Sequence, residues 1–293
     1  CGALAGTGWP VDRYYVAELL GFDDLIGSSV DCEAGQDYAT SILFALSNMA
    51  LVMSRTSMDH EIWGLEEVGH FSVNGCVAGP SSLMPQKAHP GGELEKIRYY
   101  ANDVLNAMHR GVLSLKGEPY EDLLTIYQAW NAAESAMYAF MIIFELFPKY
   151  LDNMRFDKER MLRNTAEGYS CMPDLAVYLI RNRGIGGRRA HRMCAITVFL
   201  ARERKIKGNE ITAGLFNEAL ELGGEAARDL LTTQEIRECL DPEAFIRRHD
   251  NVGDPHPDEV ARQIAQRREQ LRAFRARHQG RLDRLAKADE TLQ

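Results

Sequence analysis

Long runs of helical periodicity constrain the fold of this 293-residue chain more than any other feature. Between Tyr38 and about Trp63, apolar side chains recur every three or four residues, which is the spacing of an amphipathic helix. A second segment runs from Leu94 to Met108, and Gly111 is placed to end it. A third runs from about Leu123 to Phe147 and is closed by Pro148. With no convincing strand alternation, internal repeat or glycine-rich nucleotide loop, the sequence predicts an all-α fold.

Residues 136–144 are apolar on every face of the expected third helix. Such a stretch would be poorly placed on the surface of a monomer, and it is too short to span a bilayer. We interpret it as a helix buried between other helices, including those of neighbouring subunits.

Beyond Pro148 the expected helices are shorter and turn signals are more frequent. These signals lie at residues 184–187, 207–209, 223–224 and 254–257. We therefore expect part of a central helical domain over residues 1–155 and a smaller helical domain over residues 156–293. The expected helix that begins at Pro257 is rich in Arg and Gln and has a thin apolar stripe, which favours a solvated face over a binding site.

Composition excludes several functions. The hydrophobic content of 45% is ample for a core, and the net charge of -8 argues against nucleic acid as a partner and favours a small-molecule substrate. No apolar run is long enough to cross a membrane, and no leader pattern opens the chain. The six cysteines are scattered without C-x-x-C pairs, which favours reduced thiols in a cytoplasm and argues against a metal site; no cofactor is expected.

One irregular stretch, Ser81–Pro90, carries the chemistry, and we call it the signature segment. It combines hydroxyls, a lysine and a histidine, and its two prolines and the adjoining Gly91-Gly92 forbid regular structure. A surface segment of this kind is more often kept for chemistry than for packing. The alternative is an ordinary connector that contains Ser and Lys.

A resemblance to a known family lies in residues 81–87, Ser-Ser-Leu-Met-Pro-Gln-Lys. They are similar to G-S-S-x-M-P-x-K-x-N-P, the signature of the fumarase/aspartase superfamily, in the version used by argininosuccinate lyases. Residues 2–13 resemble the lyase segment G-A-L-A-G with V-D-R behind it, and residues 174–181 and 189–191 resemble its D-L-A-x-Y-L-V-R and Q-A-H stretches. The resemblance weakens after about residue 240. The family places Cys1 well inside its sequence, so we expect its amino-terminal domain to be absent here, through processing or as a separate polypeptide.

This resemblance implies a long central helix bundle, a homotetramer and active sites built from several subunits. The implied reaction is reversible elimination of an amine or guanidine from a succinyl group, releasing fumarate. Ser81 matches the general base and Lys87 the cation that holds a substrate carboxylate, while Ser82, Met84 and Gln86 would shape the pocket. The flanking glycines would let the segment close over substrate. The alternatives are a turn-capping hydroxyl for Ser81 and a solvated side chain for Lys87.

The departures from the family pattern point to a substrate other than argininosuccinate. His89 replaces the signature asparagine, either as a simple donor or as a titratable group, and Gln36 stands where the family has an arginine. The family's recognition segment is replaced over residues 117–133, which gain Tyr127 and Trp130; Trp130 is alternatively part of the bundle core. Glu95 is the candidate for the acid that follows the signature, or else an acid placed at a helix start.

Two hypotheses follow. The first is a carbon–nitrogen lyase of the argininosuccinate lyase type that acts on an N-substituted aspartate through Ser81. The second is a non-catalytic structural or regulatory subunit of the same descent, which the changes at Pro80, Ala88 and His89 would favour. Retention of Ser81 and Lys87 favours the enzyme.

Overall fold

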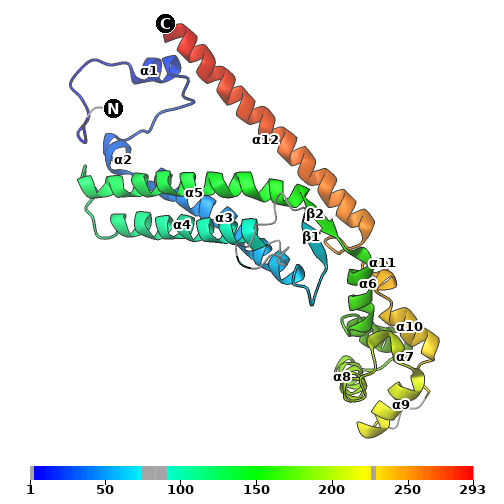
Figure 1. Cartoon of the computed structure of the whole chain (residues 1–293). Helices are drawn as coiled ribbons and strands as arrows, with labels where there is room; N and C mark the ends of the chain where they lie inside the picture. The colour runs from blue at the N-terminus through cyan, green and yellow to red at the C-terminus, as the bar shows by residue number, and fades with distance from the viewer. Residues whose placement is uncertain (1–2, 74–82, 84–90, 226–228, 293) are drawn as a thin grey trace. The chain divides into compact units, whose positions relative to one another are not determined.

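A computed structural model describes residues 3–73, 83, 91–225 and 229–292 of the chain. The chain divides into two compact units, Cys1–Asp157 with His278–Gln293, and Lys158–Arg277. Helices dominate both, so the all-α prediction is confirmed (Figure 1). The predicted domain limits, 1–155 and 156–293, stay a prediction.

The first unit is a bundle of three long helices. They are α3 (Asp37–Trp63), α4 (Gly91–Leu115) and α5 (Tyr127–Asp152). The prediction of a helix from Tyr38 to Trp63 is confirmed. Small side chains fill much of the interface between α3, α4 and α5, including Ala39, Ala101, Ala129, Ala132, Ala133 and Ala136. These alanines let the helices approach closely, and Leu43, Ile97 and Ile143 complete the apolar core between them.

Gly111 does not end its helix, so that prediction was wrong. It lies inside α4, which continues to Leu115. A Cβ atom at this position would overlap the Leu43 side chain and would lie 3.3 Å from Ala132 Cβ. Gly111 is therefore used for close packing of α4 against α3 and α5, and this packing outweighs the low helix propensity of glycine.

Pro148 does not close the third helix either, because α5 runs through it to Asp152. A proline in a helix removes one hydrogen bond and usually ends or kinks it. Here the turn after Pro148 contains Tyr150, which is fully buried against Phe71, Leu94 and Met154. Packing of Tyr150 thus stabilises the last turn of α5, although the local sequence predicts that the helix ends at Pro148.

Two short strands were not predicted from the sequence. β1 (Phe71–Val73) pairs antiparallel with β2 (Met154–Phe156), with Phe71 opposite Phe156 and Val73 opposite Met154. The 3-10 turn η1 (Leu124–Ile126) leads into α5. The β1–β2 pair joins the two chain segments that follow α3 and α5.

Two short helices precede the bundle, α1 (Arg13–Leu19) and α2 (Ser29–Ala34). The turn after α1 contacts the carboxy-terminal end of α12 (Pro257–Leu292). Gly21 has a φ of +76°, and a Cβ there would lie 3.3 Å from Ala288 Cβ, so the turn needs glycine for its conformation and its packing. Asp23 forms an ion pair of 2.7 Å with Arg284 beside this contact.

The second unit is a cluster of shorter helices. They are α6 (Lys158–Glu167), α7 (Met172–Arg183), α8 (Gly187–Glu203), α9 (Ala213–Leu222), α10 (Thr233–Leu240) and α11 (Pro242–Arg248), with the 3-10 turn η2 (Gly208–Glu210), before α12 begins. Its core is built around Leu175, Leu179, Met193, Phe216 and Ile236.

The thiols described in both units are free. They belong to Cys32, Cys171, Cys194 and Cys239. Burial raises the pKa of Cys194 to about 12 and that of Cys239 to about 11, so both act as protonated packing residues.

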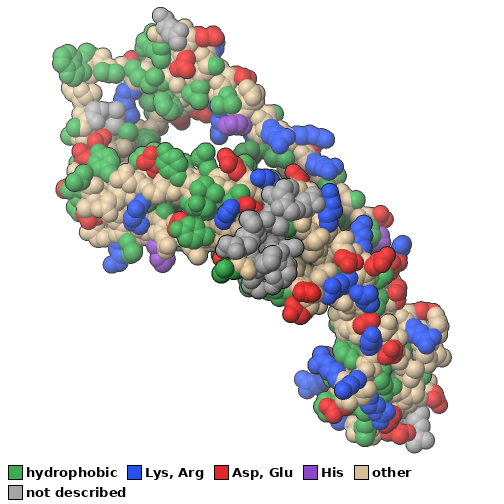
Figure 2. Space-filling view, viewed as in Figure 1, with side chains coloured by type: hydrophobic (Ala, Val, Ile, Leu, Met, Phe, Trp, Pro, Cys, Tyr) green, Lys and Arg blue, Asp and Glu red, His purple; other side chains and the backbone are tan. Residues whose placement is uncertain are grey.

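The helix predicted from Pro257 is confirmed as α12, and Lys and Arg side chains gather along it at the surface (Figure 2). None of the helices in the described part of the chain combines the length and the apolar character needed to span a bilayer.

Candidate active site

The signature segment lies almost wholly outside the described residues. The predicted site residues in that part of the chain are Ser81, Ser82, Met84, Gln86, Lys87 and His89. Their roles therefore stay predictions, and the structure describes what leads into and out of the segment. The chain reaches it from β1, which ends at Val73, and leaves it at Gly91, where α4 begins. The signature loop was expected to extend over residues 79–92, and its carboxy-terminal limit was wrong, because Gly91 and Gly92 are the first two residues of α4.

Glu95 lies near the start of α4, at the signature end of the bundle, and is exposed. Its neighbour Glu93 is in the first turn and pairs with Lys96 at 3.2 Å. Arg98, one turn on, forms an ion pair of 2.7 Å with Glu61 of α3. The position of Glu95 suits both of its predicted roles, a site acid and an acid at a helix start.

Gln36 lies at the other end of the bundle, directly before α3. Its side chain is only 7% exposed, and its Oε1 accepts a hydrogen bond of 3.2 Å from the hydroxyl of Tyr38. The Tyr38 ring lies 6.0 Å from the ring of Trp130, between centroids. Trp130 is 41% exposed, so it lies at the edge of the bundle and is not a buried core residue.

Two tyrosines near this end are held by carboxylates. The Tyr127 hydroxyl donates to Asp122 Oδ1 at 3.2 Å, and the Tyr120 hydroxyl donates to Asp31 Oδ1 at 2.7 Å. The hydrogen bond to Asp122 raises the pKa of Tyr127, and the hydrogen bond to Asp31 raises that of Tyr120. Both phenols therefore stay protonated, and their directions are fixed by carboxylates.

The predicted site residues that the structure describes lie at both ends of the bundle, Glu95 near the start of α4, and Gln36 and Tyr127 at the starts of α3 and α5. Gly111, near the end of α4, packs against Leu43 of α3 and Ala132 of α5, so the end of α4 meets the starts of the other two helices. Along α4, Glu95 is about 30 Å from Leu115 at about 1.5 Å of rise per residue. Gln36 and Tyr127 therefore lie at the end of the bundle away from Glu95 and the start of α4.

Sequence reasoning missed the acidic character of the Gln36 end. Asp31, Tyr120 and Asp122 were not predicted to belong to the site. The signal was available, because residues 14–54 and 117–148 contain acids but no Lys or Arg. This end of the bundle therefore combines carboxylates with exposed aromatic rings, an arrangement that favours a cation over an anion.

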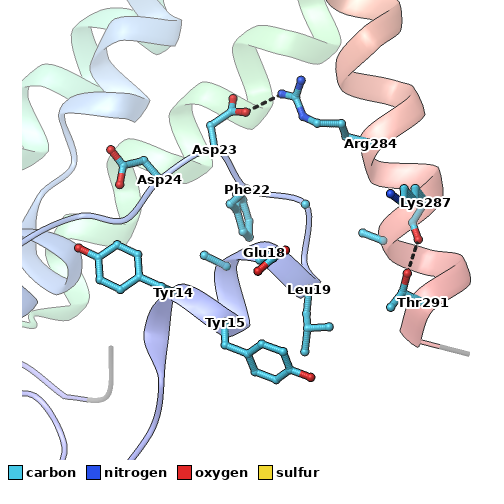
Figure 3. A pocket seen from close by; sticks show the side chains of 13 residues that line it. Tyr14, Tyr15, Glu18, Leu19, Phe22, Asp23, Asp24, Arg284, Lys287 and Thr291 are labelled. Atoms are coloured by element: carbon cyan, nitrogen blue, oxygen red, sulfur yellow. Dashed lines mark hydrogen bonds and ion pairs between the residues drawn. The ribbon is translucent and has the colours of Figure 1, made fainter.

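A cavity of about 860 Å³ lies between α1 and the last turns of α12 (Figure 3). Tyr14, Glu18 and Phe22 line one side, and Arg284 and Lys287 line the other. The cavity is lined by both acidic and basic groups, and two of them, Asp23 and Arg284, form an ion pair with each other at its edge. None of the described residues that line it is a predicted site residue.

A second cavity, of about 570 Å³, lies beside α7 in the other unit. It is lined by Asp174 and Arg181, which belong to the stretch that resembles the family's D-L-A-x-Y-L-V-R. Asp174 is buried and pairs with Arg248 at 2.7 Å, and Arg248 also donates to the carbonyls of Glu238 and Cys239. Asp174 is thus used to join α7 to α10 and α11. In the described residues, no three His, Cys, Asp or Glu side chains are grouped as a metal ion would need.

Known proteins resemble the chain over most of its length. No protein-family model matches it. The argininosuccinate lyase of Methanoculleus marisnigri is 31% identical over 280 residues, which cover 92% of this chain and 53% of that enzyme. The corresponding enzyme of Methanothrix thermoacetophila is 28% identical over 283 residues, covering 94% of this chain and 55% of that enzyme. The chain thus spans about half the length of the curated relatives it matches.

The structural likeness is close. An EDDS lyase variant with bound fumarate is 31% identical, with a TM-score of 0.88, and the match covers 99% of this chain and 57% of that one. This agreement over the whole chain, together with the argininosuccinate lyases, identifies the family that the signature segment indicated. The chain is an argininosuccinate lyase-like member of the fumarase/aspartase superfamily.

Proposed function

We propose that the chain forms part of a carbon–nitrogen lyase that eliminates an amine from an N-substituted aspartate or related succinyl compound and releases fumarate. The observation that carries this proposal is the likeness to an EDDS lyase variant, which extends over 99% of the chain. The structure of that variant contains bound fumarate. The signature segment supports it independently, because it supplies a hydroxyl and a cation in one short stretch. The substrate is not argininosuccinate itself.

In the proposed mechanism, Ser81 removes a proton from the carbon next to a substrate carboxylate. The electrons move onto that carboxylate, which becomes a doubly charged aci-carboxylate, and Lys87 stabilises the charge. The carbon–nitrogen bond then breaks, fumarate forms, and the nitrogen leaves with a proton as an amine. A serine hydroxyl is a weak base at neutral pH, so Lys87 and inward-facing backbone amides must also stabilise the alkoxide.

The remaining residues of the signature segment would bind the succinyl part. Ser82 and Gln86 would donate hydrogen bonds to its carboxylates, and His89 would donate in the position of the family's asparagine. Met84 would shape the apolar wall of the pocket. Glu95 would orient the segment from the start of α4.

The Gln36 end is proposed to bind the leaving group in a site shared between copies. About 30 Å of α4 separates Glu95 from the Gln36 end in one copy, and we propose that one small substrate meets the signature segment and the Gln36 end where two copies join. The α5 surface favours such joining, since Tyr138 is 66% exposed and Phe144 is 57% exposed in the stretch that was expected to be buried between subunits. Hydrophobic side chains are visible at the surface of the bundle (Figure 2). We propose a homo-oligomer, with four copies by analogy with the family.

The nature of this end suggests which amine leaves. Asp31 and Asp122 bring negative charge, while Tyr38 and Trp130 offer ring faces. A leaving group with an ammonium group would be attracted by the carboxylates and the ring faces, and one with an aromatic ring could pack against Tyr38 and Trp130. The carboxylates would repel an anionic leaving group. We therefore propose Gln36, Tyr127 and Trp130 as residues that select the leaving amine.

A fumarate assay tests the function. A panel of N-substituted aspartates is incubated with the protein, and fumarate is followed by its ultraviolet absorbance. Ser81→Ala should lower turnover by about 10²–10⁴-fold, as expected for loss of a general base. Ser72→Ala, an exposed serine of β1, is the matched control and should leave turnover unchanged.

Each outcome of the assay decides between the hypotheses. Unchanged turnover in Ser81→Ala would remove the base assignment. If no member of the panel yields fumarate, the non-catalytic subunit becomes the better hypothesis. Preference for anionic leaving groups would contradict the role given to the Gln36 end.

A further inference from the structure

Aromatic side chains surround His60 near the end of α3, and we call this group the His60 cluster (His60, Trp63, Phe71, Tyr150). The imidazole centroid lies 5.4 Å from the Trp63 ring, 5.6 Å from Phe71 and 5.9 Å from Tyr150. His60 is 9% exposed, and its buried Nδ1 has no hydrogen-bond partner among the described residues. Burial lowers the pKa of His60 below its ordinary value of 6.5, so the imidazole is mainly neutral at pH 7.

Tyr150 adds a second unpartnered polar group to the cluster. Its side chain is fully buried, and its hydroxyl makes no hydrogen bond within the part of the chain that the structure describes. Burial raises the pKa of this hydroxyl, so it stays protonated. Buried polar atoms without partners destabilise a fold, and their concentration in one place calls for an explanation other than packing.

The cluster holds the strand β1. Phe71 is the first residue of β1 and the one buried side chain of this three-residue strand. Beyond His60, the Phe71 ring contacts Tyr150 at 6.4 Å and Phe156 of β2 at 6.2 Å, between centroids. A strand this short has few ladder hydrogen bonds, so its position depends on how well Phe71 is packed.

We propose that neutral His60 is a positioning residue that holds β1, and that its protonation in mild acid releases Phe71 and loosens the β1–β2 pair. An imidazolium among apolar rings loses its hydration, which costs free energy. The protonated side chain is therefore more stable in contact with water than inside the cluster. Because β1 leads into the stretch that carries Ser81, release should also lower turnover; this last step rests on the proposed function.

Several groups act on the imidazole from the elements around it. On α3 the Asp59 carboxylate favours the charged form, and on α5 the Tyr150 phenol is neutral. β1 itself, with the sequence Phe-Ser-Val, carries no titratable side chain. The ring faces also favour a cation. The proposal therefore requires that loss of hydration outweighs both Asp59 and the rings.

Hydrogen exchange of the β1 and β2 amides tests the proposal without any substrate. Protection, corrected for the intrinsic pH dependence of exchange, should fall between neutral pH and about pH 5.5. The fall should approach about tenfold for each unit by which the pKa of His60 lies below its ordinary value. His60→Phe keeps a ring in the cluster but cannot be protonated, so its protection should not depend on pH. His109→Phe, at an exposed histidine of α4, should behave as the wild type.

A second measurement keeps the test valid if His60→Phe does not fold. In the wild type, NMR should show the His60 imidazole titrating below 6.5, over the same pH range in which β1 loses protection. Protection that is constant with pH, or a fall that persists in His60→Phe, overturns the proposal. Absence of fumarate at every pH would overturn the proposed function alone, since exchange does not depend on catalysis.

Discussion

Mixing two inactive variants should restore activity if each site is shared between copies. Ser81→Ala removes the predicted base in the signature segment, and Gln36→Ala removes a predicted substrate contact at the Gln36 end. In the proposed shared site these two residues come from different copies, so each variant damages a different half of the site. An oligomer that contains both variants therefore has some sites in which both halves are intact.

The expected recovery follows from counting. If each site takes its signature segment from one copy and its Gln36 end from another, random mixing in equal amounts leaves about a quarter of the sites with two intact halves. Turnover should thus return to about a quarter of the wild-type value, from variants that are each nearly inactive. The two chains are co-expressed, mixed oligomers are confirmed by native mass spectrometry, and fumarate release is measured.

The matched control combines Ser81→Ala with Lys87→Ala, which damage the same half. No site in that mixture has an intact signature segment, so no activity should return. The reasoning fails if mixed oligomers of Ser81→Ala and Gln36→Ala form but stay inactive, or if the control pair recovers equally well.

Three further predictions concern stability. Gly111→Val should lower the free energy of unfolding by about 1–3 kcal/mol in urea through overpacking, whereas Gly280→Ala, with open space around it in α12, should raise it by up to about 1 kcal/mol. Arg248→Leu should cost about 1–3 kcal/mol in thermal unfolding, since it leaves the buried carboxylate of Asp174 with only His249 Nε2 beside it, at 3.5 Å; a loss below the error of the measurement would refute this. Hydrogen bonds from Thr232, Tyr178 and Arg183 lower the pKa of Glu235 to about 2, so its stabilising effect is present above pH 4.5 and is lost as pH falls towards 2. Acid titration of Glu235→Gln should lack this part of the pH dependence.

The helices of the bundle could be predicted because their periodicity runs over many residues. α3 was predicted to within a residue of its bounds, since an apolar stripe over 27 residues leaves no other regular structure. The ends of α4 and α5 could not be predicted, because both helices continue past Gly111 and Pro148. Tertiary packing at these two positions outweighs the usual tendency of glycine and proline to end a helix. The strands were missed for a related reason. Phe71 pairs with Phe156, and three residues are too few to show alternation.

The chemistry of the candidate site could be predicted only in part. The signature segment indicates a reaction because its residue types and their order resemble those of one superfamily, and that information is local. The relation between the start of α4 and Gln36 is not local, since it depends on α4 running antiparallel to α3 and α5. Asp31 and Tyr120 were missed because they lie 89 residues apart in sequence and meet only in the fold.

The two ends of the bundle carry complementary chemistry, and this favours a shared site on electrostatic grounds. A substrate of the proposed kind has a dianionic succinyl half and an amine half. Lys87 and the amides of the signature segment suit the first half, and the carboxylates of Asp31 and Asp122 suit the second. If both sets lay side by side in one copy, Lys87 would pair with these acids in the absence of substrate. In the proposed shared site the two sets come from different copies, so that assembly and substrate binding, and not folding of the single chain, bring the charges together.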